Sequence, residues 1–270
     1  MSSVILTDVA DRVGIITLNR PGQRNALNGY LIKALEEAVQ MMAANDKVKV
    51  VILTGAPSDG MHGGFCSGGD TKEGAMIPGD RTSRAVPKDA LEGDLARHDL
   101  HAAMLLHQMS KPTIAMVGGP AVGAGCSLAA ACDLRFASDD ATFASSFSSN
   151  GLSGDYGGSF LWTRIMGTAR ARELYFLNDK ITAAQAYEWG MVNKVVPAAE
   201  LREFTIATAV RMTKTSASIY ALMKDNLNEA EYELDRRRFL FANEAANQNI
   251  SSADIAERRR RKAAAAAIEG

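Results

Sequence analysis

Two glycine-rich turns are the segments of this chain whose residue types and spacing could perform chemistry. The first reads Gly63-Gly64-Phe65-Cys66-Ser67-Gly68-Gly69-Asp70, and the second reads Gly118-Gly119-Pro120-Ala121-Val122-Gly123-Ala124-Gly125-Cys126. Glycine allows main chain to approach a ligand closely, because no Cβ atom stands in the way. The first N–H groups of a helix have no partners inside that helix, so they can point at negative charge. If the two turns meet at one point, they supply two donors to an oxyanion that develops during a reaction.

A single carboxylate stands at a third position of interest. The segment 151–158 reads GLSGDYGG and places Asp155 just before a Gly-Gly pair that predicts a helix start. An aspartate in an apolar pocket loses hydration, which raises its pKa toward the range useful for proton exchange. The alternative is that Asp155 caps the helix, a common role for this residue type. The hydroxyl of Tyr156 could bind a polar group of a substrate, or its ring could simply pack.

The strands and helices that must position these groups are predicted from the sequence as an α/β part followed by a helical part. Apolar runs predict strands at residues 4–7, 13–18, 48–53, 112–117, 134–137, 141–147 and 191–196. Asn28 predicts the cap of a helix that runs to about residue 44, and further helices are expected at about 95–109 and 125–131. The polar stretch 71–93 predicts a long surface loop.

The last part of the chain reads differently from the first. From Gly158 onward helical patterns dominate, with breaks near Gly167, 178–180, Gly190 and Pro197, and only 191–196 reads as a strand. The expected organisation is therefore an α/β core over residues 1–200, which carries the candidate site, and a helical C-terminal region over residues 201–270.

Composition excludes several classes of function. Hydrophobic residues make up 47% of the 270 residues and charged residues 23%, as in ordinary soluble globular proteins. The formal net charge of −1 gives no overall field that favours nucleic acid or a membrane. No apolar run approaches about 18 residues, and no signal-peptide pattern opens the chain, so we expect a cytoplasmic protein. The three cysteines, Cys66, Cys126 and Cys132, fit a reducing compartment.

A series of short motifs runs along most of the chain. They are LNRP at 18–21 with RNALN at 24–28, TG at 54–55, FCSGGD at 65–70, KP at 111–112 through Gly125, CDLR at 132–135, GL at 151–152 and GMVN at 190–193 through Pro197. In this order and over residues 13–257, the motifs resemble those of the crotonase, or enoyl-CoA hydratase/isomerase, superfamily. Any one of them alone is weak, but the ordered set is specific.

The resemblance implies a crotonase-type spiral of ββα repeats followed by a C-terminal helical trimerisation region. It also implies an acyl-CoA thioester substrate and a homotrimer or hexamer. No metal or redox cofactor is implied, since coenzyme A enters only as part of the substrate. By position, the family's oxyanion-hole amides fall on Gly69 and Ala124. The positions that would contact coenzyme A are Arg24, Ala26 and the backbone of Ser67, Gly68 and Asp70.

The family's hydratases use two glutamates to hold and activate a water molecule. This chain carries Ser127 and Phe147 at those positions, so the resemblance argues against simple hydration. Both residues are retained as candidates for substrate contact, although Ser127 could also be a local helix cap. Asp155 is similar in position to the acid/base aspartate of family isomerases and to the nucleophilic aspartate of the dehalogenase branch.

The leading hypothesis is that the enzyme shifts a C=C bond through a thioester enolate, with Asp155 moving the proton. One alternative is a hydratase or C–C bond hydrolase that acts on a ring or oxygenated acyl-CoA through Asp155 and water. A non-enzymatic alternative is a protein that binds CoA or RNA on the same scaffold, using the basic run at 258–262. A solvated terminal helix is the simpler interpretation of that run.

Three weaker patterns have simpler interpretations. His98 and His101 could begin a zinc site or line the acyl pocket, but no third ligand is apparent, and a surface position is simpler. Gly123-Ala124-Gly125 resembles a dinucleotide fingerprint, yet Leu128 stands where the third glycine is needed. The serines of 145–149 could line a pocket for an oxygenated acyl group or form a polar loop.

Overall fold

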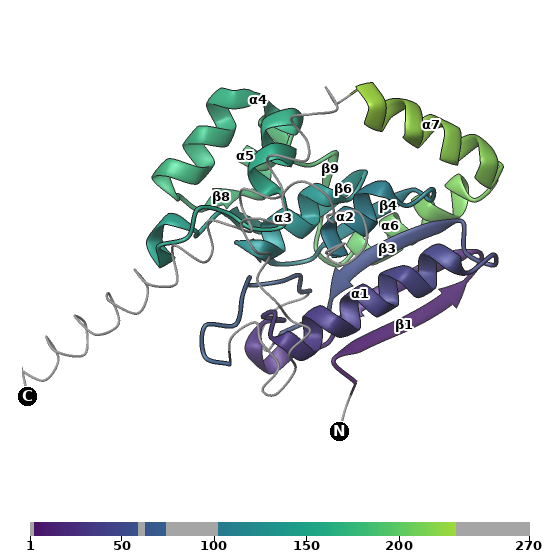
Figure 1. Ribbon diagram of the computed structural model, residues 1–270, viewed down its shortest axis with the longest axis horizontal. Helices are drawn as coiled ribbons and strands as arrows, with labels where there is room; N and C mark the ends of the chain where they lie inside the picture. The colour runs from purple at the N-terminus through teal and green to yellow at the C-terminus, as the bar shows by residue number, and fades with distance from the viewer. Residues whose placement is uncertain (1–2, 59–62, 74–101, 231–270) are drawn as a thin grey trace, which may run out of the picture.

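The computed structural model describes residues 3–58, 63–73 and 102–230, and every structural statement below concerns these residues. The elements in chain order are β1 (Ile5–Ala10), β2 (Val13–Leu18), η1 (Pro21–Gln23), α1 (Gly29–Ala44), β3 (Val50–Gly55), α2 (Ala102–Gln108), β4 (Thr113–Val117), β5 (Pro120–Val122), α3 (Ala124–Ala131), β6 (Leu134–Ser138), β7 (Thr142–Ala144), η3 (Ser148–Asn150), α4 (Gly158–Leu177), β8 (Ile181–Thr182), α5 (Ala183–Glu188), β9 (Lys194–Val196), α6 (Leu201–Met212) and α7 (Ala217–Ala230). Figure 1 shows their arrangement.

Two sheets form the frame of the molecule. The larger sheet has six strands in the order β1-β2-β3-β4-β6-β9, with β1 antiparallel to β2 and the later neighbours parallel. The smaller sheet has the order β5-β7-β8. The units β4-β5-α3 and β6-β7-α4 each give one strand to each sheet before their helix begins. This repetition is the ββα spiral that the resemblance implied.

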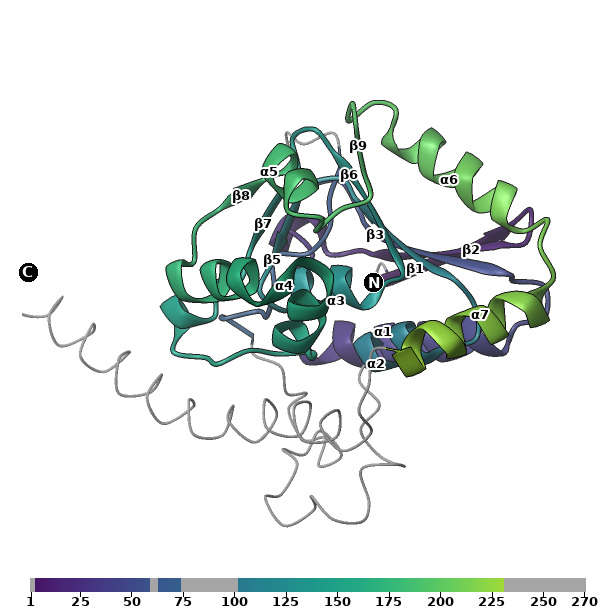
Figure 2. The same cartoon turned by 90° about the horizontal axis from the view of Figure 1, so that it is seen from above.

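The inner strands of the larger sheet are buried on both faces because their side chains alternate between two apolar layers, whereas the edge strand β1 is mostly exposed. One layer packs with α1, α2 and α3, and its strand residues include Ile16, Leu53, Ala115 and Ala137. The other packs under α6, and its strand residues include Ile15, Ile52, Ile114 and Phe136. Figure 2 shows α6 on one side of this sheet and α1 and α2 on the other. The short helix α3 is buried along its whole length.

Several predicted elements are confirmed, and four strands differ from prediction. The Asn28 side chain caps α1 by accepting from the Leu31 N–H, and Gly167 breaks α4 with a φ of 78°. The short strands β5 and β8 were not predicted, because β5 lies inside the second glycine turn and β8 has only two residues. The strand predicted at 141–147 covers only Thr142–Ala144, and the one at 191–196 covers only Lys194–Val196.

Other predictions fall wholly or partly outside the described residues. These are the loop at 71–93 beyond residue 73, the first part of the helix at 95–109, the histidine pair His98 and His101, and the basic run at 258–262. The division at residue 200 stays a prediction.

A buried lysine ties α7 to the core. The Lys224 ammonium donates to the carbonyls of Leu106 and Lys111, at 2.9 and 3.2 Å, and pairs with the Asp133 carboxylate at 2.8 Å. The same carboxylate accepts from the N–H and the hydroxyl of Thr113. One side chain of α7 therefore donates to a buried carbonyl at the end of α2 and to another in the segment between α2 and β4.

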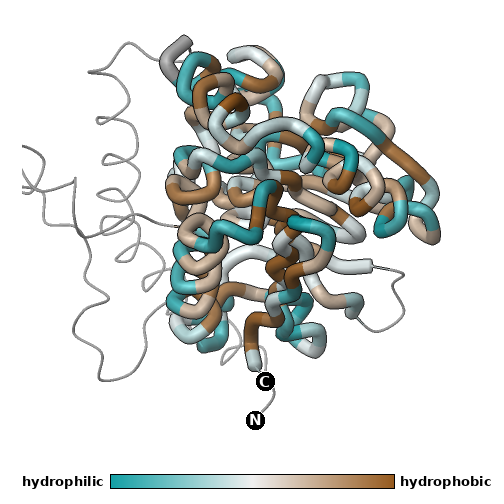
Figure 3. Tube along the Cα trace, turned by 90° about the vertical axis from the view of Figure 1, so that its right-hand side faces the viewer, coloured by the Kyte–Doolittle hydropathy of each residue, from teal (hydrophilic) through white to brown (hydrophobic). Residues whose placement is uncertain are grey.

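Apolar residues are distributed in short stretches along the trace. Figure 3 shows hydrophobic and hydrophilic residues alternating on this scale. Among the described helices, none is both long enough and apolar enough to cross a membrane.

Candidate active site

The two glycine turns lie side by side. The Cys66 N–H donates to the Pro120 carbonyl at 3.2 Å, and the Val122 N–H donates to the Cys66 carbonyl at 2.9 Å. These bonds pair the first turn with β5 as a short parallel bridge. The sequence predicted a shared site only if the two turns meet, and in the fold they do meet.

Glycine is required at the points where the turns touch. A Cβ atom on Gly68 would lie 2.8 Å from the Val122 carbonyl oxygen and 3.7 Å from the Ala124 nitrogen, and the φ of Gly68 is +91°. A Cβ atom on Gly63 would lie 2.6 Å from the Gly118 carbonyl oxygen. The turns therefore meet main chain against main chain, at separations that a side chain would prevent.

Two backbone donors remain unengaged at this contact. Within the described part of the chain, neither the Gly69 N–H nor the Ala124 N–H donates to a protein acceptor. Gly69 is exposed, and Ala124 is the first residue of α3, where the helix dipole is positive. Gly68 therefore lies next to both amides, and their joint role as an oxyanion hole stays a prediction.

Gly125 explains why the second turn resembled a dinucleotide fingerprint. A Cβ atom on Gly125 would overlap the Cys66 backbone and lie 2.7 Å from the Cys66 Cβ. This glycine therefore serves close packing of α3 on the first turn.

The thiols near the turns are not poised for nucleophilic attack. Burial raises the pKa of the Cys66 and Cys126 thiols to about 12. A thiol of such high pKa is protonated at neutral pH and packs as an apolar group.

Asp70 supports the first turn from inside the protein. Its carboxylate pairs with Arg20 at 2.9 Å and accepts from the N–H groups of Lys72 and Glu73. The hydrogen bond from the Glu73 N–H and the Arg20 guanidinium together hold the pKa of this carboxyl below its ordinary value. The Asp70 N–H donates to Leu27, so only its carbonyl oxygen is left for the predicted contact with coenzyme A.

The other predicted coenzyme A positions gather along the edge of the first turn. The Ser67 N–H donates to the Arg24 carbonyl at 3.1 Å, and Arg24 itself is exposed with a φ of +51°. Ala26 is nearly buried, two residues further along the same segment. The fold brings these residues together, while their contact with coenzyme A stays a prediction.

Asp155 lies at the entry of α4 but does not cap the helix. The N-cap residue is Gly157, which has no side chain with which to cap the helix. The half-buried Asp155 carboxylate accepts from the Tyr156 N–H at 2.8 Å, and its carbonyl accepts from the Gly158 N–H. The capping interpretation is therefore wrong, and the proton-transfer role stays a prediction.

Tyr156 is held in an unusual backbone conformation. Its φ is +53°, which is rare for a residue with a large side chain, and only 6% of its surface is exposed. Burial, followed by the charges of Asp155 and Glu36, raises the pKa of the Tyr156 phenol well above its ordinary value. The hydroxyl therefore stays protonated at neutral pH, and the ring packs in the core.

Ser127 and Phe147 lie behind the second turn and are almost completely buried. The Ser127 hydroxyl faces the Gly123 carbonyl at 3.4 Å, a weak hydrogen bond. The Phe147 ring stacks on Tyr175, with centroids 5.7 Å apart. Tyr175 was missed in the sequence because it lies beyond the break of α4. Contact of Ser127 or Phe147 with substrate stays a prediction.

The serine-rich segment bonds mainly to the protein itself. The Ser145 hydroxyl donates to the Leu174 carbonyl at 2.9 Å, and the side chains of Ser149 and Asn150 donate to the Ser146 carbonyl. These contacts correspond to the polar-loop interpretation of the segment.

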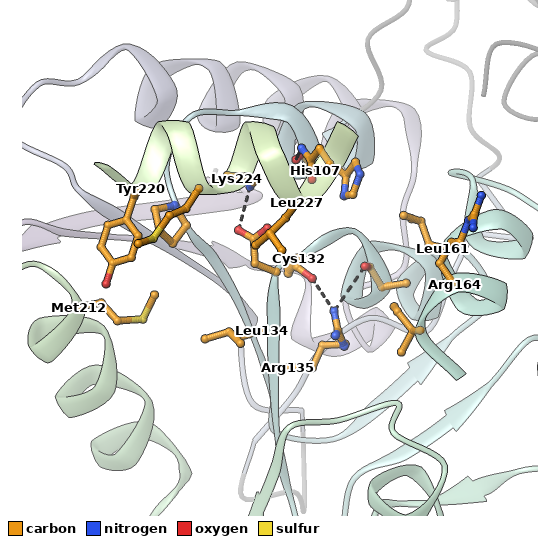
Figure 4. Close-up of a pocket in the computed structure, with 16 residues that line it drawn as sticks. His107, Cys132, Leu134, Arg135, Leu161, Arg164, Met212, Tyr220, Lys224 and Leu227 are labelled. Carbon is orange, nitrogen blue, oxygen red and sulfur yellow. Dashed lines mark hydrogen bonds and ion pairs between the residues drawn. The ribbon is translucent and has the colours of Figure 1, made fainter. Parts of the chain in front are cut away.

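A cavity of about 560 Å³ lies at the C-terminal end of α3, away from the two glycine turns, and is shown in Figure 4. Its walls come from α2, α4, α6, α7 and the residues that follow α3, and they include Lys224 and Asp133. Neither glycine turn lines it, and neither does Asp155. We therefore place the candidate active site at the N-terminal end of α3, where the unengaged amides lie.

Comparison with known proteins gives consistent matches over most of the chain. The family model for enoyl-CoA hydratase/isomerase matches residues 8–265. The 1,2-epoxyphenylacetyl-CoA isomerase of Escherichia coli (strain K12) is 32% identical over 232 residues, which cover 86% of this chain and 84% of that protein. The 4-chlorobenzoyl coenzyme A dehalogenase-1 of Arthrobacter sp is 31% identical and covers 85% of this chain and 79% of that protein. The crystal structure of an enoyl-CoA hydratase from Mycobacterium avium subsp. paratuberculosis K-10 superposes with a TM-score of 0.76 at 29% identity, covering 93% of this chain and 94% of that one.

Proposed function

Because this chain belongs to the enoyl-CoA hydratase/isomerase family, we propose that it shifts a C=C bond of an acyl-CoA through a thioester enolate. The coarser statement, an enzyme that processes acyl-CoA on the crotonase fold, follows from the family and the fold. The observation that carries the enolate step is the pair of unengaged N–H groups of Gly69 and Ala124, both next to Gly68.

The proposed reaction uses one carboxylate twice. Asp155 removes a proton from the substrate carbon chain, and the electron pair moves onto the thioester oxygen between the two amides. The double bond then shifts as Asp155 returns the proton to another carbon. One fixed donor of this kind lowers an acyl-transfer barrier by about 3 kcal/mol, and two donors aimed at the same oxygen favour the enolate strongly.

Isomerisation is preferred over hydration because of the residues behind the second turn. Hydration needs a water molecule held and activated beside the substrate. The two buried residues at the positions expected to do this are Ser127 and Phe147, and neither is a carboxylate. A single aspartate is sufficient for a proton that leaves one carbon and returns to another.

Coenzyme A is proposed to enter as part of the substrate, along the edge that carries Arg24, Ala26 and the backbone of 67–70. No metal or redox cofactor is required by the proposed steps. A cytoplasmic location fits a water-soluble thioester substrate and the reducing compartment that the three cysteines suggested.

A homotrimer or hexamer is proposed as the working assembly. The support is the face of α7, where Ile219, Leu222, Met223 and Leu227 are between 44% and 68% exposed. An apolar stripe of this kind marks an interaction surface more often than an ordinary free surface. Light scattering on the purified protein is expected to give the mass of three or six chains, and a mass of one chain at micromolar concentration would contradict this assembly.

The reaction itself is tested with a panel of unsaturated aliphatic, aromatic and alicyclic CoA thioesters in heavy-oxygen water. We expect a positional isomer of at least one substrate, formed without incorporation of the heavy oxygen. A hydroxyacyl product that carries the label would indicate hydration, and a labelled ring-opened acid would indicate C–C hydrolysis. Binding of the thioesters with no turnover would favour the non-enzymatic alternative.

A further inference from the structure

A continuous wall of buried and partly buried groups stands behind the Ala124 amide. It begins at Gly123, where a Cβ atom would lie 3.9 Å from Cε1 of Phe147. The Phe147 ring then stacks on Tyr175, with an interplanar angle of 26°. A Cβ atom on Gly158 would lie 2.6 Å from the Tyr175 hydroxyl oxygen and closer still to Oγ of Ser127. The wall therefore encloses the first turn of α3, from Gly123 to Ser127.

Tyr175 is held firmly in this wall. The preceding residue, Leu174, is fully buried, and its carbonyl accepts from the Ser145 hydroxyl at 2.9 Å. The Ser145 hydroxyl also contacts the Asn178 side chain at 3.1 Å. These contacts fix the last turn of α4 against the end of β7, and the break at Gly167 lets that turn fold back toward α3.

We propose that Tyr175 determines reaction specificity: with Phe147 it fills the compartment behind the Ala124 amide, so that no water molecule can sit beside the C=C bond of the bound acyl chain. This inference rests on the proposed isomerisation. The compartment has polar atoms that could hold a water, namely Oγ of Ser127 and the Gly123 carbonyl oxygen, which lie 3.4 Å apart. A buried water needs such partners and enough volume, so the two rings exclude it by occupying the volume.

The chemical consequence concerns what is added to the double bond. In hydration, water gives its oxygen to one carbon of the C=C bond, while a proton goes to the neighbouring carbon. Because the water oxygen must bond to the conjugated thioester before any enolate forms, a closed compartment blocks hydration at its first step. The enolate that forms when Asp155 removes a proton then regains a proton on another carbon, which completes isomerisation. The rings thereby select between two outcomes that share the same oxyanion hole and the same aspartate.

The test is the product ratio of ring-deletion variants in heavy-oxygen water. Tyr175→Ala is expected to raise the ratio of labelled hydroxyacyl-CoA to isomer by about tenfold or more, because deletion of a ring leaves room for water. Tyr175→Phe keeps the ring and is expected to leave the ratio unchanged. The matched control is Phe176→Ala, which removes a ring from the next residue, a position that is 76% exposed. It is expected to behave as the unmodified enzyme.

The outcomes separate this inference from the proposed function. If the unmodified enzyme isomerises a substrate and Tyr175→Ala folds with an unchanged product ratio, the specificity role is wrong. If Tyr175→Ala does not fold, Phe147→Leu opens the same compartment from its other side, and an unchanged ratio there also overturns the proposal. An unmodified enzyme that itself incorporates the label refutes the proposed function instead.

Discussion

Replacing Asp155 by Asn is expected to lower kcat for isomerisation by about 10³-fold or more, since the substitution removes the general acid–base group. Asparagine has nearly the same shape and retains an oxygen that can accept from the Tyr156 N–H, the bond that orients this side chain. The fold and the affinity for a saturated acyl-CoA are therefore expected to stay within a few-fold of those of the unmodified enzyme.

The measurement combines steady-state kinetics with hydrogen exchange. In heavy water, a saturated acyl-CoA is expected to exchange its α-protons on the unmodified enzyme, and this exchange is expected to disappear together with kcat in Asp155→Asn. The matched control is Asp179→Asn, an exposed aspartate just beyond α4, which is expected to retain full activity. Undiminished turnover or exchange in Asp155→Asn would reject the assigned role.

Replacing Gly68 by Ala is expected to damage both the fold and the catalysis. An alanine with a φ near +91° is strained, and its Cβ would lie 2.8 Å from the Val122 carbonyl oxygen. Together these effects are expected to cost about 2–4 kcal/mol in the free energy of unfolding. Because the two turns must then separate, one amide leaves the oxyanion position, and kcat is expected to fall by a further factor of about 10²–10³.

The neighbouring glycine provides the structural control for this substitution. A Cβ atom on Gly69 meets no atom within 4 Å, and the φ of Gly69 is not positive. Gly69→Ala is therefore expected to keep the unfolding temperature within about 1 °C, since it adds a methyl group in open space on an ordinary backbone. Equal destabilisation of the two variants would show that the close contact of the turns does not limit stability.

Much of the fold could be predicted because local patterns and tertiary packing agree. The cap at Asn28 and the apolar face of α1 specify that helix from nearby residues alone. The strand β5 could not be predicted, because its three residues are extended only where they pair with Cys66 and with β7. Two-residue β8 depends in the same way on β7, which is a partner distant in sequence.

The candidate site was predictable in its backbone but not in its walls. The glycines marked both turns, since no other residue fits where the turns touch. The sequence did not indicate that Tyr175 lies near the site, because its position depends on the break at Gly167 and on the hydrogen bond from Ser145. Asp155 could be located, but whether it capped α4 was decided only by the φ of Gly157, which takes the cap position itself.

The contact between Gly63 and Gly118 has a consequence for how enzymes of this kind can diversify. Because the two turns contact each other through peptide groups, side-chain substitutions around the cleft can change the reaction without changing the spacing of the Gly69 and Ala124 amides. The similar proteins include one named as an isomerase and another as a dehalogenase. This difference is expected where the backbone of the site is constant and the side chains around it vary. For engineering, the residues to randomise are Ser127, Phe147 and Tyr175, whereas the glycines of both turns should be left untouched.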